Sequence, residues 1–202
     1  MIRPMLPTDI ESVVDIHLAA FAGFFLSSMG KHFLKDFYET TLLDKSSIAL
    51  ISLQGDEISG FAVGTVAPRG FYRRTILKNW QRFLVASIIP ILNEPQTALR
   101  LFKRLLMTTQ SNYIDNQALL MSIAVYPSRQ RSGIGKRLIQ CFSTEAERRG
   151  ATSISLITDK LNNDPTNQFY IRSGFICTNS YITSEGRPMN EYRKFFVCPS
   201  IG

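Results

Sequence analysis

Apolar positions along this chain fall into short alternating or continuous stretches that predict several β-strands. Residues 47–53 and 57–66 are rich in β-branched and apolar side chains, and Gln54-Gly55-Asp56 separates them, which predicts a β-hairpin. Residues 118–125 form a nearly continuous apolar run, a pattern typical of a central strand covered on both faces. These stretches place a β-sheet in the middle of the fold.

Other stretches repeat apolar residues at the spacing of an amphipathic helix. Asp9 precedes such a run at residues 10–18, after an apolar start at Ile2 that predicts an edge strand. Gly150 ends a second helical run at residues 135–149. The remaining elements are a strand at 153–158, a short helix at 166–172 and two strands at 175–182 and 190–197. This order of strands and helices predicts an α/β (α+β) fold.

Residues 21–43 carry a concentration of aromatic side chains interrupted by Gly30. The spacing predicts two short helices, or one helix and a loop. Because an aromatic stripe at helical spacing usually packs in the core, we expect most of these side chains to be buried and one or two to line an acceptor pocket. The group consists of Phe21, Phe24, Phe25, Phe33, Phe37 and Tyr38.

The composition fits one soluble domain. The chain has 202 residues and is 45% hydrophobic, which suffices for a core and excludes a disordered chain. Cys141, Cys177 and Cys198 form no close-spaced pair, so we expect no disulfide framework and no metal site, and predict three small core residues in a reducing compartment. The start lacks a signal-peptide pattern, and no stretch has the roughly 20 apolar residues of a transmembrane helix, so we expect a cytoplasmic protein.

The net charge of +7 is concentrated in one segment. Residues 69–110 contain eight basic residues and one acid, so the rest of the chain is neutral overall. A single basic segment indicates an anionic substrate, a phosphate-bearing cofactor or an acidic membrane surface rather than nucleic acid. We interpret residues 69–116 as a basic helical insertion in a single domain of residues 1–202. Its many apolar residues must pack on the domain, on a second subunit of a homodimer or on a membrane.

The most informative segment joins the apolar strand at 118–125 to the helix at 135–149. A buried strand that runs through a short glycine-containing loop into a helix directs unpaired N–H groups and the positive helix end at one spot, which is the geometry of an anion site. Gly133 and Gly135 let a phosphate approach the backbone, and Arg131 and Lys136 add positive charge. The segment matches neither the dinucleotide fingerprint nor the P-loop.

At these residues the sequence resembles the GCN5-related N-acetyltransferase (GNAT) family. Gln130, Gly133 and Gly135 fill in register the family's central motif, Gln/Arg-x-x-Gly-x-Gly/Ala, after a strand and at the start of a helix. Residues 163–175 match a second motif, Asn-x-x-Ala-x-x-Phe-Tyr-x-x-x-Gly-Phe, except that Thr166 replaces the alanine. The resemblance spans the chain apart from the basic insertion.

The resemblance implies a GNAT fold with a mixed central sheet of about six to seven strands, flanked by helices. The sheet would splay open beside the strand at 118–125, with acetyl-CoA as co-substrate in the opening. The backbone of Ile123 and Val125 would pair with the pantetheine arm as a further strand would. Asn163 would hydrogen-bond the pantetheine or cysteamine portion, although its place before a helix also fits a capping residue. The pyrophosphate would be held by Gln130, Arg131, Ser132, Gly133, Ile134, Gly135 and Lys136.

The resemblance also implies direct attack of a neutral amine on the thioester. Tyr170 is then the candidate general acid, because a phenol can donate a proton to the departing thiolate; packing on the sheet is the alternative role. The general base is left open, since the strand at 118–125 has no carboxylate and Ser122 could act only through water. Other sources are a water chain, Asp115, His17, His32 and Glu39.

These observations predict an acetyl-CoA-dependent N-acetyltransferase that modifies the primary amine of a small acceptor. An amino sugar, free or nucleotide-linked, is the favoured acceptor, because the basic segment suits a diphosphate and would repel a polyamine. The alternative is a non-catalytic acyl-CoA-binding module that docks on a membrane or a partner through the basic insertion.

Overall fold

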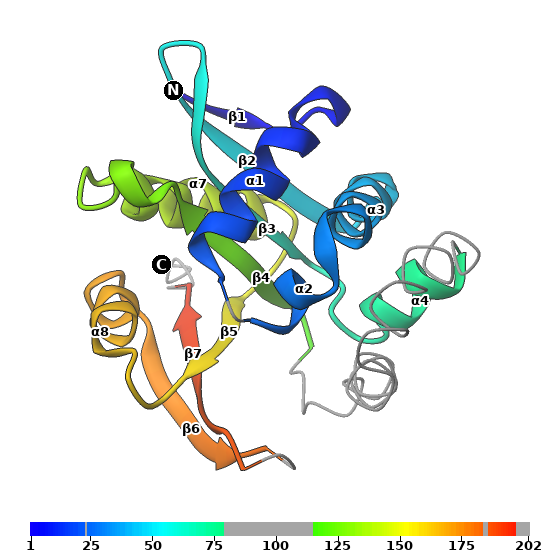
Figure 1. Ribbon diagram of the computed structural model, residues 1–202. Helices are drawn as coiled ribbons and strands as arrows, with labels where there is room; N and C mark the ends of the chain where they lie inside the picture. Colours follow the sequence, from blue (N-terminus) through cyan, green and yellow to red (C-terminus); the bar gives the residue numbers. More distant parts are fainter. Residues whose placement is uncertain (23, 79–114, 184–185, 197–202) are drawn as a thin grey trace, which may run out of the picture.

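The computed structural model describes residues 1–22, 24–78, 115–183 and 186–196. The strands described there form one mixed sheet in the order β1-β2-β3-β4-β5-β7-β6 (Figure 1). They are β1 (Ile2–Pro4), β2 (Ser47–Gln54), β3 (Glu57–Thr65), β4 (Gln117–Val125), β5 (Ser153–Asp159), β6 (Ile176–Ile182) and β7 (Pro188–Phe195). Neighbouring strands pair antiparallel except β4 and β5, which pair parallel.

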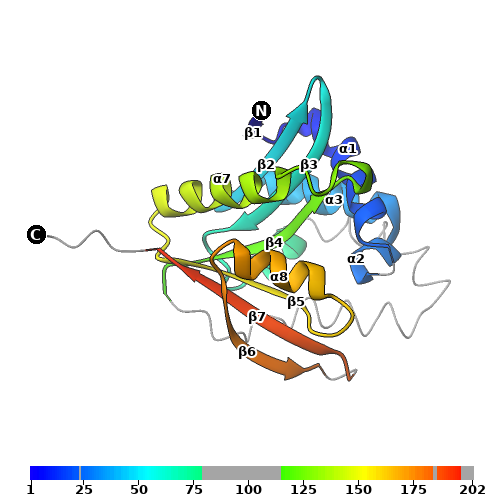
Figure 2. The same ribbon diagram turned by 90° about the vertical axis from the view of Figure 1, so that its left-hand side faces the viewer.

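Helices cover both faces of this sheet. They are α1 (Ile10–Ala20), α2 (Phe25–Ser28), α3 (Gly30–Leu43), α4 (Phe71–Lys78), α7 (Ile134–Arg148) and α8 (Asp164–Arg172), with short 3-10 turns η1 (Pro7–Asp9) and η3 (Pro127–Arg129). α1 and α3 pack on one face, and α7 packs on the opposite face (Figure 2). The predicted mixed sheet flanked by helices is therefore confirmed, and the predicted elements agree with the observed ones within a few residues.

The alternation of side chains along the strands builds two cores. On β3, Phe61 and Val63 point to α1 and α3, whereas Ala62 points to α7. On β4 a bulge at Met121 changes this alternation. Val63 of β3 pairs with Ser122, but the next residue, Gly64, pairs with Leu120, so that Met121 is an extra residue. Leu120 therefore packs in the α7 core, whereas Ala124 packs with α1 and α3.

The sheet opens between β4 and β5. These strands pair only through Gln117, Ala118 and Leu119 of β4, opposite residues 153–155 of β5. On its other side β4 stays paired with β3 as far as Val125. Residues 120–125 of β4 therefore have no strand partner on the β5 side, which is the splayed sheet that the sequence resemblance predicted.

The expected burial of the cysteines was wrong for the two that the structure describes. Cys141 and Cys177 are free and exposed. Cys141 occupies an outward position of α7, and Cys177 lies on β6, the edge strand whose side chains are all exposed. Cys198 lies outside the described residues.

Only the two ends of the basic insertion are described. α4 begins it with Phe71 fully buried, and the ring of Tyr72 lies 6.4 Å from that of Phe37. Arg69 and Asp115, 3.0 Å apart, form an ion pair that joins the two ends. Residues 79–114, which carry most of the insertion's apolar side chains and half of its basic ones, lie outside the described residues. Among the helices that the structure describes, none is long and apolar enough to cross a bilayer.

Candidate cofactor and active site

The open edge of β4 leads directly into a cluster of backbone donors. After Val125 the chain passes through η3 and enters α7, with Gly133 as the N-cap in a left-handed conformation at φ 79° and without a side-chain cap. The N–H of Arg137 donates to the carbonyl of Gly133 at 3.1 Å. The N–H groups of Ile134, Gly135 and Lys136 precede this bond, so they have no acceptor within the helix and are available to an anion.

The seven residues predicted to hold a pyrophosphate lie together on this loop and the first turn of α7. Arg131 and Lys136 are exposed, and Arg131 has φ 61°. Gln130 and Ser132 are instead engaged with the loop itself. Gln130 Nε2 donates to the carbonyl of Val125 at 3.4 Å, and Ser132 Oγ donates to that of Arg129 at 2.5 Å.

The two glycines of the motif serve different purposes. Gly133 has open space around its Cα, so only its left-handed φ requires glycine. A Cβ on Gly135 would instead come within 3.1 Å of Phe169 Cζ and 3.8 Å of Val125 Cγ2. Gly135 therefore lets α7 approach α8 and the end of β4, in addition to the phosphate approach that the sequence suggested.

Ile123 and Val125 lie in the stretch of β4 that has no partner on the β5 side. Both side chains pack against the α7 core. Their backbone therefore stands at the open edge, where an extended ligand can pair with it as an added strand.

Asn163 is the N-cap of α8, but its side chain does not cap the helix. Its Nδ2 donates to Thr158 Oγ1 at 2.9 Å and to the carbonyl of Asp159 at 3.2 Å, at the end of β5. Neither bond uses Oδ1, so this oxygen can accept an N–H from a ligand. Asn163 thus occupies a capping position and keeps an acceptor for the predicted role.

The sequence analysis missed Asn167, which is buried and links three parts of this region. Its Nδ2 donates to the carbonyls of Asp159 and Asn163, both at 3.0 Å. Its Oδ1 accepts from Tyr192 Oη at 2.9 Å and from Asn190 Nδ2 at 3.3 Å. It falls at a variable position of the second motif, so only its polarity on the inner face of a short helix could have singled it out.

Tyr170 is buried, with its ring in the α7 core. Its neighbours are Phe169, Phe175 and Tyr192, with ring centroids 5.4, 5.8 and 5.8 Å away. Burial raises the pKa of the phenol well above its usual value, so the hydroxyl stays protonated at neutral pH. Among the described residues, its hydroxyl makes no hydrogen bond. Both alternatives raised by the sequence, the packed ring and the proton donor, are compatible with this position.

The candidate bases are scattered. Asp115 is exposed and paired with Arg69, and His32 is exposed on α3. Glu39 is half-buried on the same helix. His17 is buried, and its burial lowers the pKa of the imidazole to about 4, so it is neutral at pH 7 and a weak base.

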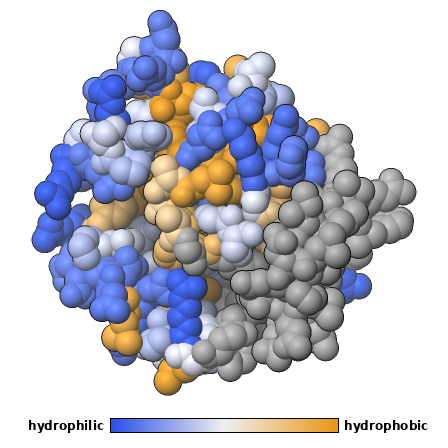
Figure 3. Space-filling view, viewed as in Figure 1, coloured by the Kyte–Doolittle hydropathy of each residue, from blue (hydrophilic) through white to orange (hydrophobic). Residues whose placement is uncertain are grey.

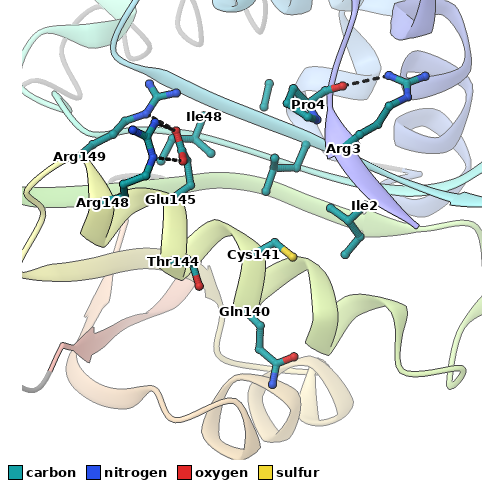
Figure 4. Close-up of a pocket in the computed structure, with 12 residues that line it drawn as sticks. Ile2, Arg3, Pro4, Ile48, Gln140, Cys141, Thr144, Glu145, Arg148 and Arg149 are labelled. Carbon is teal, nitrogen blue, oxygen red and sulfur yellow. Dashed lines mark hydrogen bonds and ion pairs between the residues drawn. The ribbon is translucent and has the colours of Figure 1, made fainter.

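A separate hollow of about 530 Å³ lies between α7 and the strands β1 and β2, away from the open edge of β4 (Figure 4). Ile2 and Ile48 contribute apolar walls, and Arg148 and Arg149 hold Glu145 at its rim. Hydrogen bonding from Arg148 lowers the pKa of Glu145 to about 2, so this carboxylate is a poor base.

On the opposite face of the sheet, apolar surface gathers at the centre of the side that carries α1, α2 and α3 (Figure 3).

The open edge of β4 and the backbone donors at the start of α7 are two features that the sequence resemblance predicted. A model described as the acetyltransferase (GNAT) family matches residues 10–175. The chain therefore belongs to the GNAT acetyltransferase family, as its motifs predicted. No curated protein sequence matches the chain.

Solved structures share the fold over nearly the whole chain at low sequence identity. A putative GNAT acetyltransferase from Desulfovibrio desulfuricans has a TM-score of 0.64 and 16% identity, covering 96% of this chain and 98% of its own. The ribosomal-protein-S18-alanine N-acetyltransferase from Escherichia coli has a TM-score of 0.61 and 16% identity, covering 100% and 98%. An aminoglycoside 6'-N-acetyltransferase complexed with coenzyme A has a TM-score of 0.62 and 15% identity, covering 99% of both chains.

Proposed function

We propose that this chain transfers an acetyl group from acetyl-CoA to the primary amine of a small acceptor. The observation that carries the proposal is the open edge of β4 at residues 120–125, which runs directly into the free N–H groups at the start of α7. In the reaction the amine nitrogen bonds to the acyl carbon and the carbon–sulfur bond breaks. One proton leaves the nitrogen and one proton is taken up by the sulfur.

Each predicted residue has a role in this reaction that fits its position. The backbone of Ile123 and Val125 pairs with the pantetheine arm. The N-terminus of α7, with Arg131 and Lys136, holds the pyrophosphate. Asn163 accepts an amide N–H of the same arm, and Tyr170 donates a proton to the thiolate.

An amino sugar, free or linked to a nucleotide, is the proposed acceptor. Aminoglycoside 6'-N-acetyltransferases are among the proteins that share the fold, and aminoglycosides carry amines on sugar rings. The basic segment at residues 69–110 would attract an acceptor that bears a diphosphate and repel a polyamine.

Cofactor binding is tested by the melting temperature with and without acetyl-CoA. At about 100 times its dissociation constant, a ligand adds roughly 2.7 kcal/mol to the free energy of unfolding. Lys136→Glu places a negative charge at the start of α7 and should reduce this shift. Lys35→Glu, an equal change of charge at an exposed position of α3, should leave it unchanged.

Catalysis is tested by thiol release from acetyl-CoA with four probe amines: glucosamine, UDP-glucosamine, spermidine and a peptide with a free N-terminal alanine. The proposal expects the highest rate with one of the two amino sugars. A faster reaction with spermidine or the peptide overturns the acceptor assignment. Binding of acetyl-CoA without thiol release for any amine favours the alternative, a non-catalytic acyl-CoA-binding module.

A further inference from the structure

A buried pair of polar side chains lies beneath the face of the sheet that α1 and α3 cover. His17 of α1 is 2% exposed and Tyr38 of α3 is 0% exposed, and His17 Nδ1 lies 2.7 Å from Tyr38 Oη. Aromatic rings surround the pair, with that of Phe21 4.7 Å from His17 and that of Phe61 5.5 Å from Tyr38. Burying these groups costs free energy that two apolar side chains would not.

The second ring nitrogen of His17 increases the free-energy cost of burying this pair. His17 Nε2 is buried and has no hydrogen-bond partner within the described part of the chain. An unsatisfied buried polar group is unusual in a protein core and calls for an explanation. Such groups are often retained because they serve a functional site.

The pair reaches the open edge of β4 through Ser122. Ser122 pairs with Val63, which belongs to the same core as Tyr38, so its side chain shares their face of the sheet. The Ser122 hydroxyl lies close enough to that of Tyr38 to lower the pKa of the phenol. Ser122 also stands next to the bulge at Met121, within the stretch that has no partner on the β5 side.

The protonation states restrict the hydrogen bonds that these three groups can form. Burial lowers the pKa of His17 to about 4 and raises that of Tyr38, so the imidazole is neutral and the phenol keeps its proton at pH 7. Ser122 lowers the pKa of Tyr38, but the opposing effect of burial is larger. Tyr38 can then donate to Nδ1 of the His17 tautomer that carries its proton on Nε2, and the phenol oxygen can accept from Ser122 Oγ.

We propose that His17 and Tyr38 are positioning residues that hold the Ser122 hydroxyl at the open edge of β4, where Oγ accepts a hydrogen bond from the acceptor amine. The inference rests on the proposed function and adds a residue that orients the nucleophile. Ser122 takes no proton in this role. A neutral His17 that gains a proton only near pH 4 could not keep one delivered through Tyr38 at neutral pH.

The test is a double-mutant cycle on kcat/KM, measured with whichever of the four probe amines reacts fastest. Ser122→Ala, Tyr38→Phe and His17→Phe should each lower kcat/KM roughly three- to tenfold, the loss of about one hydrogen bond. Because Tyr38 acts through Ser122, the Tyr38→Phe/Ser122→Ala double variant should lose no more than Ser122→Ala alone.

Thr40→Val is the matched control, because it removes from the same helix a buried hydroxyl that donates to the backbone carbonyls of Asp36 and Phe37. Its kcat/KM should equal that of the wild type. Equal rates for Tyr38→Phe and Thr40→Val, or losses that add in the double variant, overturn the inference while the proposed function stands. Absence of thiol release with every probe amine removes the proposed function and this inference with it.

Discussion

The guanidinium of Arg187 lies 5.1 Å from the centre of the Phe24 ring. Arg187 precedes β7 and Phe24 precedes α2, so this contact joins the part of the sheet formed by β5 and β7 to the α1–α2 connection. The same guanidinium forms an ion pair with Asp159 at the end of β5. The contact thus bridges the two sides of the splayed sheet.

Arg187→Ala should therefore loosen the connection between the two sides. We expect the free energy of unfolding to fall by about 1 kcal/mol, because Arg187 is 46% exposed and exposed ion pairs and cation–π contacts each contribute little. Phe24→Leu, which keeps an apolar side chain without the ring, should cost about 0.5 kcal/mol. Urea unfolding of both variants and of the double variant measures the coupling, and strictly additive losses would show that the contact contributes nothing.

Gly133 provides a second test. Its φ of 79° should make Gly133→Ala about 1–2 kcal/mol less stable than the wild type, and Gly133→Asn less affected, since asparagine tolerates the left-handed region. The acetyl-CoA-induced rise in melting temperature should shrink in the same order, because the N–H groups of the first turn lose their orientation. Equal stabilities for Gly133→Ala and wild type, by thermal or urea unfolding, would contradict this account.

Asn167 is expected to contribute strongly to stability, although it falls at a variable position of the second motif. Asn167→Ala leaves the hydroxyl of Tyr192 and the carbonyls of Asp159 and Asn163 with fewer partners, so we expect a loss of about 2–3 kcal/mol in urea unfolding. The dissociation constant of acetyl-CoA should rise as Asn163 loses its support. Gln168→Ala, at the exposed neighbouring position, is the control and should change neither quantity. A stable variant with unchanged affinity would show that the network is dispensable.

The sequence predicted the elements because each has a local signal. The apolar run at 118–125 and the amphipathic helix at 135–149 determine where β4 and α7 lie, and the glycine motif between them locates the anion site. Local patterns also show that Phe33, Phe37 and Tyr38 belong to the core, where the structure buries all three.

The rest depends on contacts between distant segments, which no local pattern encodes. The end of β4–β5 pairing at Leu119 is set by how the two halves of the sheet twist apart. His17, Tyr38 and Ser122 come from three elements and share no motif, so their proximity appears only in the folded chain. Cys141 was misjudged because an apolar neighbourhood in sequence does not say which face of a helix a residue takes.

His17 should make the stability of the protein fall in mild acid. The pKa is 6.5 for an ordinary histidine and about 4 for the buried one, so as the pH falls the unfolded chain binds a proton first. The free energy of unfolding should therefore decrease by up to about 3 kcal/mol between pH 6.5 and 4 through this group, and the contribution is fully present above pH 6.5. His17→Phe should show a flatter profile over that interval, and parallel profiles for the two proteins would contradict the lowered pKa.

Tyr170→Phe separates a proton donor from a packed ring. Because no hydrogen bond of its hydroxyl is found within the described residues, its removal should change the free energy of unfolding by less than about 0.5 kcal/mol. Tyr192→Phe, which removes a hydroxyl bonded to Asn167 in the same aromatic cluster, should cost about 1 kcal/mol.

For activity, Tyr170→Phe should lower kcat by about 100-fold or more, the usual contribution of general acid catalysis. A general acid must be protonated to act, and burial raises the pKa of Tyr170 above its usual value of 10, so Tyr170 should cause no fall in kcat of the wild type between pH 7 and 10. Rates at saturating acceptor over this interval, alongside urea unfolding, decide between the two roles. A stable Tyr170→Phe variant with wild-type kcat would show that the ring only packs in the core and that water protonates the thiolate.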